Sequence, residues 1–196
     1  MRTSPLGRRV FVARHGETDW NAEERWQGHT DIPLNEVGQL QARLLAMRLR
    51  SHAIGGVVTS DLSRAAETGR IVAAELGVGV VYVDSALRER SFGVFEGLTR
   101  HECETLHAEE WQAWLDHKRV PPGGEAQEAL SARIVAAIGR VGEAIARDDA
   151  PALVVTHGGA LRALVLAVTG TMTTPVKNGA VWIGTWDGRV VDMQAM

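Results

Sequence analysis

Short apolar runs alternate with longer segments of helical periodicity along the chain. Four of the runs are rich in valine and predict strands, at 10–13, 56–59, 78–83 and 152–156. Five of the longer segments predict helices, at 35–50, 60–76, 99–117, 125–147 and 158–168. After residue 178, two further β-rich runs flank Asp187-Gly188 and predict a hairpin. This order predicts an α/β fold, a three-layer α/β/α sandwich with a mostly parallel central sheet.

Residues at the ends of these segments predict where helices begin and end. Asn35 can cap the helix at 35–50, Ser60 or Asp61 can cap the next helix, and Gly77 can end it. In the first of these helices, spacings of three and four place the apolar residues on one face, namely Val37, Leu40, Leu44 and Met47.

Composition indicates one globular unit. The 196 residues are 45% hydrophobic and 23% charged, with no linker or shift in composition, so we expect a single domain over 1–196 with a lid-like helical segment at about 99–124. A net charge of −3 argues against a nucleic-acid-binding surface. The apolar runs are too short for a signal peptide or a membrane span. Cys103 is the only cysteine, which excludes an internal disulfide and fits a reducing compartment, so we expect a cytoplasmic protein.

Basic side chains follow three of the predicted strands. Arg14 and His15 come directly after the first strand, Arg64 follows the second, and His157 follows the fourth. Because the carboxyl ends of parallel strands meet at one edge of a sheet, we expect these residues to share a crevice. The helices that follow Ser60 and Gly158 would point their N-termini into it. Together these groups predict a pocket for a dianionic phosphoryl group.

Each of these residues also has an ordinary structural explanation. Alone, Arg64 is more often an exposed helix residue, and His157 a hydrogen-bonded histidine at a strand end. Trp111 and Trp114 are three residues apart and favour packing over ligand stacking. No residues have the spacing of a zinc site, so we expect no metal, and the absence of a glycine-rich nucleotide loop argues against a kinase.

The ordered motifs resemble those of the histidine phosphatase superfamily, in the branch that contains cofactor-dependent phosphoglycerate mutases and broad-specificity phosphatases. The resemblance covers most of the chain. Its main motifs are Arg14-His15-Gly16-Glu17-Thr18, Ser60-Asp61-Leu62-Ser63-Arg64-Ala65, Phe92-Gly93-Val94-Phe95-Glu96-Gly97, Pro122-Gly123-Gly124-Glu125 and Val155-Thr156-His157-Gly158-Gly159.

The resemblance implies a catalytic role for five residues. His15 would attack phosphorus and become a phosphohistidine, while Arg14, Arg64 and His157 would bind the phosphoryl oxygens. Glu89 would protonate the leaving group and later take a proton from water. His15 must be neutral to attack, so we expect a backbone acceptor to fix its tautomer.

Further residues match binding positions of the same family. Glu17 is a rival for the role of general acid because it is close to His15 in sequence, although Glu89 is the better match. The phosphoryl group or the substrate would also contact Asn21, Gln27, Gly28 and Gly158.

The resemblance implies metal-independent hydrolysis of a phosphate monoester, with a small phosphorylated metabolite as partner and no cofactor, nucleic acid or membrane. One alternative is a 2,3-bisphosphoglycerate-dependent phosphoglycerate mutase, which Arg90 after Glu89 favours. The short segment between Gly97 and Gly123 favours hydrolysis instead, since a small lid admits water. A second alternative is a catalytically idle protein that binds a phosphorylated ligand. The sequence leaves the oligomeric state open, with a homodimer as one option.

Overall fold

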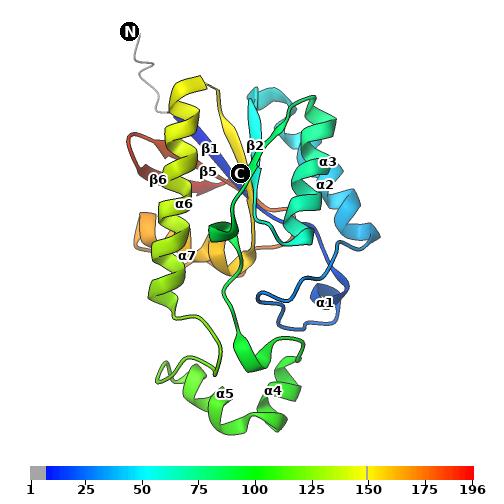
Figure 1. Cartoon of the computed structure of the whole chain (residues 1–196), viewed down its shortest axis with the longest axis vertical. Coiled ribbons are helices and arrows are strands. Elements are labelled where there is room, and N and C mark those ends of the chain that lie inside the picture. Colours follow the sequence, from blue (N-terminus) through cyan, green and yellow to red (C-terminus); the bar gives the residue numbers. More distant parts are fainter. Residues whose placement is uncertain (1–7, 149) are drawn as a thin grey trace.

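The computed structural model describes residues 8–148 and 150–196 and has one mixed sheet between helices (Figure 1). The strands are β1 (Arg8–Arg14), β2 (Gly56–Thr59), β3 (Val80–Val83), β4 (Ala152–Thr156), β5 (Val181–Trp186) and β6 (Val190–Ala195). They lie in the order β3-β2-β4-β1-β5-β6. The four strands from β3 to β1 are parallel, and the hairpin β5–β6 adds two antiparallel strands beside β1. The predicted mostly parallel sheet and C-terminal hairpin are confirmed.

Helices cover both faces of the sheet. They are α1 (Asp19–Ala22), α2 (Glu36–Leu49), α3 (Ser63–Leu76), α4 (Arg100–Leu106), α5 (Ala108–Leu115), α6 (Gln127–Asp148) and α7 (Gly158–Thr169). Short 3₁₀ turns lie at Arg50–His52, Ser85–Leu87 and Gly93–Phe95. Phe11 and Ala13 of β1 pack with α2 and α3, whereas Val10 and Val12 pack with α6 and α7. This alternation follows from the two-residue period of a strand and produces the predicted three layers (Figure 1).

The predicted cap of α2 is confirmed, because Asn35 Oδ1 accepts a hydrogen bond from the Gly38 amide at 2.9 Å. The predicted cap of α3 is wrong. Helix α3 begins at Ser63, whose amide donates to Asp31 Oδ1 at 2.7 Å. Ser60 Oγ lies 2.9 Å from His157 Nε2, and Asp61 forms an ion pair with Arg88. Gly77 ends α3 with a left-handed backbone conformation, φ 69°, as predicted.

The apolar residues predicted to share one face of α2 do so, but that face is exposed to solvent. Leu40 is 54% exposed and Met47 is 60% exposed. The face toward the core carries Gly38, Ala42, Leu45, Ala46 and Leu49. Glycine is required at position 38 because a Cβ there would overlap the backbone of Glu17. The helix therefore packs closely on the turn that follows β1.

The predicted helix at 99–117 is two helices, α4 and α5, which meet at His107 with φ −136° and ψ 45°. They lie at one end of the molecule (Figure 1). Cys103 and Trp111 from these helices pack with Phe95 in a separate apolar cluster, which Trp26 and Trp114 also contact. The break at His107 lets both short helices face this cluster. The packing role predicted for Trp111 and Trp114 is confirmed. None of the described helices has the length and apolar character that a membrane crossing requires.

Candidate active site

The carboxyl ends of β1, β2 and β4 open onto one pocket of about 320 Å³. Eight of the nine residues predicted from the sequence line it, namely Arg14, His15, Asn21, Gln27, Gly28, Arg64, Glu89 and Gly158. The ninth, His157, is fully buried beside the pocket, and its ring centroid lies 5.1 Å from that of His15. The structure therefore brings together residues from four distant parts of the chain.

His15 is 3% exposed and is held by the turn that follows β1. Its Nδ1 lies 2.6 Å from the carbonyl oxygen of Gly16, which can only accept, so Nδ1 carries the proton and Nε2 has the lone pair. The Gly16 amide donates to Thr68 Oγ1 at 3.0 Å, and Asn178 Nδ2 donates to the carbonyl oxygens of both His15 and Gly16 at 3.1 Å. These bonds fix the orientation of the imidazole.

The pKa of His15 is lowered well below its ordinary value. Burial is the largest cause, and the positive charges of Arg14 and Arg64 add to it. The imidazole is therefore neutral at neutral pH. A neutral ring with a bonded Nδ1–H is the state that a nitrogen nucleophile requires, and the predicted backbone acceptor is the carbonyl of Gly16.

The nitrogens of the Arg14 guanidinium differ in their contacts. Its Nη1 donates to the Val176 carbonyl at 2.6 Å. Among the described residues, its buried Nε has no hydrogen-bond partner. Because Arg14 also lines the pocket, an anion there can accept from this group. Burial lowers the pKa of the guanidinium, and the charges of Glu89 and Glu17 oppose that effect.

Arg64, in the first turn of α3, is completely buried. Its Nη1 and Nη2 donate to the carbonyls of Thr30 and Gly28 at 2.9 and 2.8 Å, and its Nε donates to His157 Nδ1 at 3.2 Å. Burial lowers its pKa to about 10, so the side chain stays charged at neutral pH. The guanidinium places a fixed positive charge at the pocket and also holds the loop at 28–30.

Both ring nitrogens of His157 have protein partners. Nδ1 accepts from Arg64, so Nε2 carries the proton and donates to Ser60 Oγ at 2.9 Å. The pKa of His157 is lowered well below its ordinary value, first by burial and then by the charges of Arg64 and the other nearby basic groups. In this arrangement His157 is neutral and orients Arg64. Its direct contact with a phosphoryl group stays a prediction.

The carboxylate of Glu89 lies at the N-terminus of α7. It accepts from the backbone amides of Gly159 and Ala160 at 2.8 and 3.0 Å, and from the amide of Arg90 at 2.8 Å. A Cβ at position 159 would overlap this carboxylate, so a larger residue there would displace the tip of Glu89. The sequence predicted that the N-terminal amides of this helix would be open to a phosphoryl group. Two of them bind Glu89 instead.

Glu17, the other candidate for the general acid, forms hydrogen bonds that connect the turn after β1 to the start of α2. Its Oε1 accepts from Asn35 Nδ2 at 3.1 Å, and its backbone carbonyl accepts from the Asn35 amide at 3.0 Å. Glu17 is not among the residues that line the pocket. Of the two candidate acids, Glu89 is the one that lines the pocket.

Three further predicted binding residues lie between β1 and α2, Asn21 in α1 and Gln27 and Gly28 in the loop that follows it. Asn21 Oδ1 accepts from the Thr18 amide and from Asn178 Nδ2, at 3.2 and 3.1 Å. Gly28 has φ 52°, and a Cβ there would overlap Glu96, so both its conformation and its surroundings require glycine. Within the described chain, Oε1 of Gln27 is buried and has no partner. It remains available to a ligand.

Two arginines at the pocket were not predicted from the sequence. Arg25 is engaged by Glu23, Glu102 and the Gly97 carbonyl. Arg162 is different, because its buried Nε has no partner among the described residues. Its position four residues after Gly158, one helical turn into α7, was a signal that could have identified it.

No group of three or more His, Cys, Asp or Glu side chains in the described parts of the chain is arranged to hold a metal ion. Cys103 lies in the apolar cluster with Phe95, and burial raises the pKa of its thiol to about 11.

Comparison with known proteins identifies the family. Residues 10–189 match the model of the histidine phosphatase superfamily (branch 1). The chain is 40% identical over 159 residues to phosphoglycerate mutase-like protein 4 of Arabidopsis thaliana, which covers 79% of this chain and 68% of that protein. Similar structures include a mycobacterial glucosyl-3-phosphoglycerate phosphatase complexed with VO3, with a TM-score of 0.83, 29% identity and coverage of 96% and 97% of the two chains. An alpha-ribazole phosphatase of Shigella flexneri has a TM-score of 0.79, 28% identity and 91% coverage of both chains. The chain therefore belongs to branch 1 of the histidine phosphatase superfamily and is an enzyme of the phosphomonoesterase type.

Proposed function

We propose that this protein hydrolyses phosphate monoesters of small metabolites through a phosphohistidine on His15, without a metal ion. The observation that carries the proposal is the state of His15. The ring is buried and neutral, and its Nδ1–H is bonded to the Gly16 carbonyl, so the lone pair of Nε2 is available to attack. Arg14 and Arg64 supply positive charge at the same pocket.

In the first step, Nε2 of His15 forms a bond to phosphorus, and the bond from phosphorus to the leaving oxygen breaks. Glu89 gives a proton to that oxygen, so the product leaves as an alcohol. The ring retains its Nδ1–H and becomes positively charged, and the Gly16 carbonyl stabilises that charge.

In the second step, water attacks phosphorus and the P–N bond breaks. The Glu89 carboxylate takes a proton from the water, which restores the acid for the next turnover. His15 returns to its neutral form, and inorganic phosphate leaves. Arg14, whose Nε has no partner in the described part of the chain, and the charged Arg64 stabilise the transferred group in both steps.

The short segment between Gly97 and Gly123 supports hydrolysis over phosphoryl transfer to a second substrate. Its helices α4 and α5 pack on their own apolar cluster, and the pocket keeps an opening through which water can reach phosphorus. The Arabidopsis relative is named as phosphoglycerate mutase-like, so the mutase reaction is the alternative that the experiment below must distinguish.

Release of inorganic phosphate should be measured with a panel of phosphomonoesters that includes 3-phosphoglycerate, in the presence of EDTA. Rapid quenching at high pH followed by mass spectrometry would detect the phosphate on His15. Release that persists in EDTA and is abolished in His15→Ala is the expected result. Formation of 2-phosphoglycerate without phosphate release would identify a mutase. Binding of the esters without turnover would identify an idle binding protein.

A further inference from the structure

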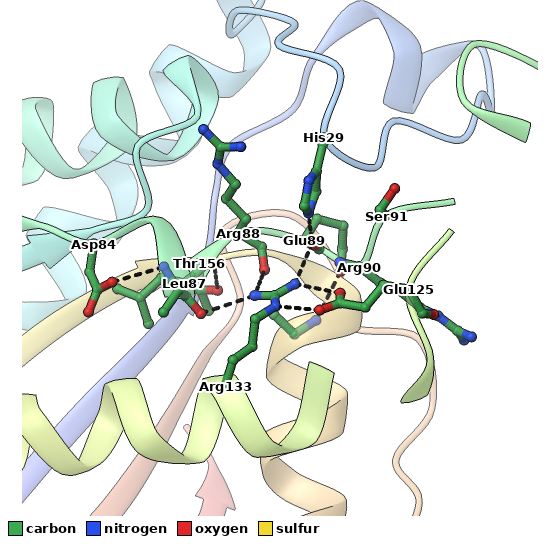
Figure 2. Close-up of polar contacts among 12 residues, drawn as sticks. His29, Asp84, Leu87, Arg88, Glu89, Arg90, Ser91, Glu125, Arg133 and Thr156 are labelled. Atoms are coloured by element: carbon green, nitrogen blue, oxygen red, sulfur yellow. Dashed lines mark hydrogen bonds and ion pairs between the residues drawn. The ribbon is translucent and has the colours of Figure 1, made fainter. Parts of the chain in front are cut away.

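Arg133, in the second turn of α6, lies at the centre of a polar network around the backbone that carries Glu89 (Figure 2). It is not among the residues that line the pocket, and the sequence analysis gave it no role. Its side chain is 21% exposed, and that of its partner Glu125 is 16% exposed. Burying a charged pair costs desolvation free energy, so this pair indicates a specific structural or functional role.

The Arg133 guanidinium uses every donor it has. Nε and Nη2 donate to the two carboxylate oxygens of Glu125, each at 2.7 Å. Nη1 donates to the carbonyls of Ala86 and Arg88 at 3.0 and 2.7 Å, and Nη2 also donates to the carbonyl of Glu89 at 2.7 Å. These five bonds equal the five N–H groups of an arginine.

The segment 86–89 depends on side chains for its backbone bonds. Leu87 O accepts from Thr156 Oγ1 at 2.7 Å, and Glu89 O accepts a second bond from His29 Nε2 at 2.8 Å. With the three bonds from Arg133, each of the four successive carbonyls has a side-chain donor. Buried carbonyls outside a strand ladder need such partners, so these side chains set the path of the backbone.

Glu125 is itself anchored. Its amide donates to the Ser91 carbonyl at 2.9 Å, on the far side of Glu89 along the chain. Burial tends to raise the pKa of Glu125, but the hydrogen bonds and charge of Arg133 outweigh it and lower the pKa overall. The ion pair therefore links α6 to the backbone both before and after Glu89 (Figure 2).

We propose that Arg133 is a positioning residue for Glu89, and that its planar five-bond contact fixes the carboxyl group at the distance needed to protonate the leaving oxygen. The proposal rests on the function proposed above. The tip of Glu89 is held by the amides of α7, and its backbone is held by Arg133, so a shift at either end moves the carboxyl group. A misplacement of about 1 Å can cost about a hundredfold in rate.

The test uses two substrates that differ in their need for a proton. Glycerol phosphate has an alkoxide leaving group that must be protonated, whereas p-nitrophenolate leaves without a proton. We would measure kcat/KM on both for the wild type, Glu89→Gln, Arg133→Lys and the double variant. Arg140→Lys is the matched control. Arg140 is on the same helix and also forms an ion pair, with Asp84 at 2.6 Å, but its side chain is more exposed than that of Arg133.

Arg133→Lys keeps the charge but loses the planar fork. We expect kcat/KM on glycerol phosphate to fall by about tenfold or more, with a change of no more than about threefold on p-nitrophenyl phosphate. The double variant should lose no more on glycerol phosphate than Glu89→Gln alone, because Arg133 acts through Glu89. Arg140→Lys should match the wild type.

Equal losses on both substrates, or additive losses in the double variant, would overturn the role of Arg133 while leaving that of Glu89 intact. If Glu89→Gln itself shows no preference between the substrates, the proposed acid is wrong and the positioning role is wrong with it. Thermal unfolding would check that each variant is folded. If Arg133→Lys does not fold, Glu125→Gln, which removes the charge that aligns the guanidinium, is judged by the same criteria.

Discussion

The imidazole rings of His15 and His157 lie edge to face with centroids 5.1 Å apart, and both are neutral. Two protonated rings this close, beside two arginines, would repel one another strongly. Burial removes that conflict by keeping protons off both rings. The two rings can therefore lie side by side at the pocket while Arg14 and Arg64 keep their positive charge.

This depressed pKa of two histidines predicts how stability depends on pH. The unfolded chain takes up protons at an ordinary histidine pKa of about 6.5, and the folded chain does so only at lower pH. The free energy of unfolding should therefore be fully present above about pH 6.5 and fall below it. The loss is up to about 1.4 kcal/mol per pH unit for each histidine.

Urea unfolding of the wild type and of His157→Gln between pH 7 and pH 5 would check this dependence. The free energy of unfolding of the variant should fall less steeply with decreasing pH. The difference in slope should correspond to about one bound proton, because one of the two buried rings is gone. His101→Gln is the control, since His101 is exposed. An equal slope in the wild type and in His157→Gln would contradict the prediction.

Gly159→Ala should uncouple activity from stability. The added Cβ overlaps the Glu89 carboxylate, so we expect kcat/KM on glycerol phosphate to fall by about tenfold or more. Alanine favours a helix by up to about 1 kcal/mol, so thermal unfolding should show no large loss of stability. Gly139→Ala, where the new Cβ would meet no described atom within 4 Å apart from its chain neighbours and the adjacent backbone of α6, should keep full activity. A fully active Gly159→Ala would show that the position of Glu89 at α7 is irrelevant to turnover.

Glu17→Gln should have a small effect on kcat/KM, because Glu17 bonds Asn35 and does not line the pocket. Glutamine can keep the acceptor oxygen of that bond. Steady-state assays on glycerol phosphate and p-nitrophenyl phosphate would compare it with Glu89→Gln. If Glu17→Gln were the variant with the selective loss on glycerol phosphate, the two carboxyl groups would exchange roles.

Arg162→Met should weaken the binding of substrates that carry a second negative group. Arg162 lines the pocket and its Nε has no partner within residues 8–148 and 150–196, whereas Arg25 is already paired. A charged hydrogen bond of about 1.5–3 kcal/mol corresponds to a KM higher by about tenfold or more for 3-phosphoglycerate. The KM for p-nitrophenyl phosphate, which has no second anion, should change little. Parallel increases for both substrates would argue against this contact.

The sequence predicted those parts of the fold and site that depend on local pattern. Strands β2 and β4 have the predicted bounds because each is a short valine-rich run buried on both sides. The convergence of Arg14, His15 and Arg64 followed from the parallel direction of those strands.

Contacts between distant segments could not be predicted in the same way. Ser60 resembles a helix cap, but its hydroxyl accepts a hydrogen bond from His157 Nε2. The first amide of α3 instead donates to Asp31, which lies on another loop. Periodicity placed Val37, Leu40, Leu44 and Met47 on one face of α2 but could not show that a second face, with Leu45 and Leu49, is the one that packs on the core. Arg133 gave no signal at all, because its role comes from carbonyl groups more than forty residues earlier in the chain.

The position of Glu89 at the start of α7 has a consequence for the balance between stability and activity. Active-site groups commonly reduce stability, so that replacing them makes a protein more robust. Here the proposed acid also satisfies two amides that the helix leaves open, a contribution of about 1 kcal/mol for an N-terminal cap. A chain that lost this carboxylate would lose robustness together with turnover. Selection for stability alone would therefore retain the proposed acid, and a descendant without it would need another cap for α7.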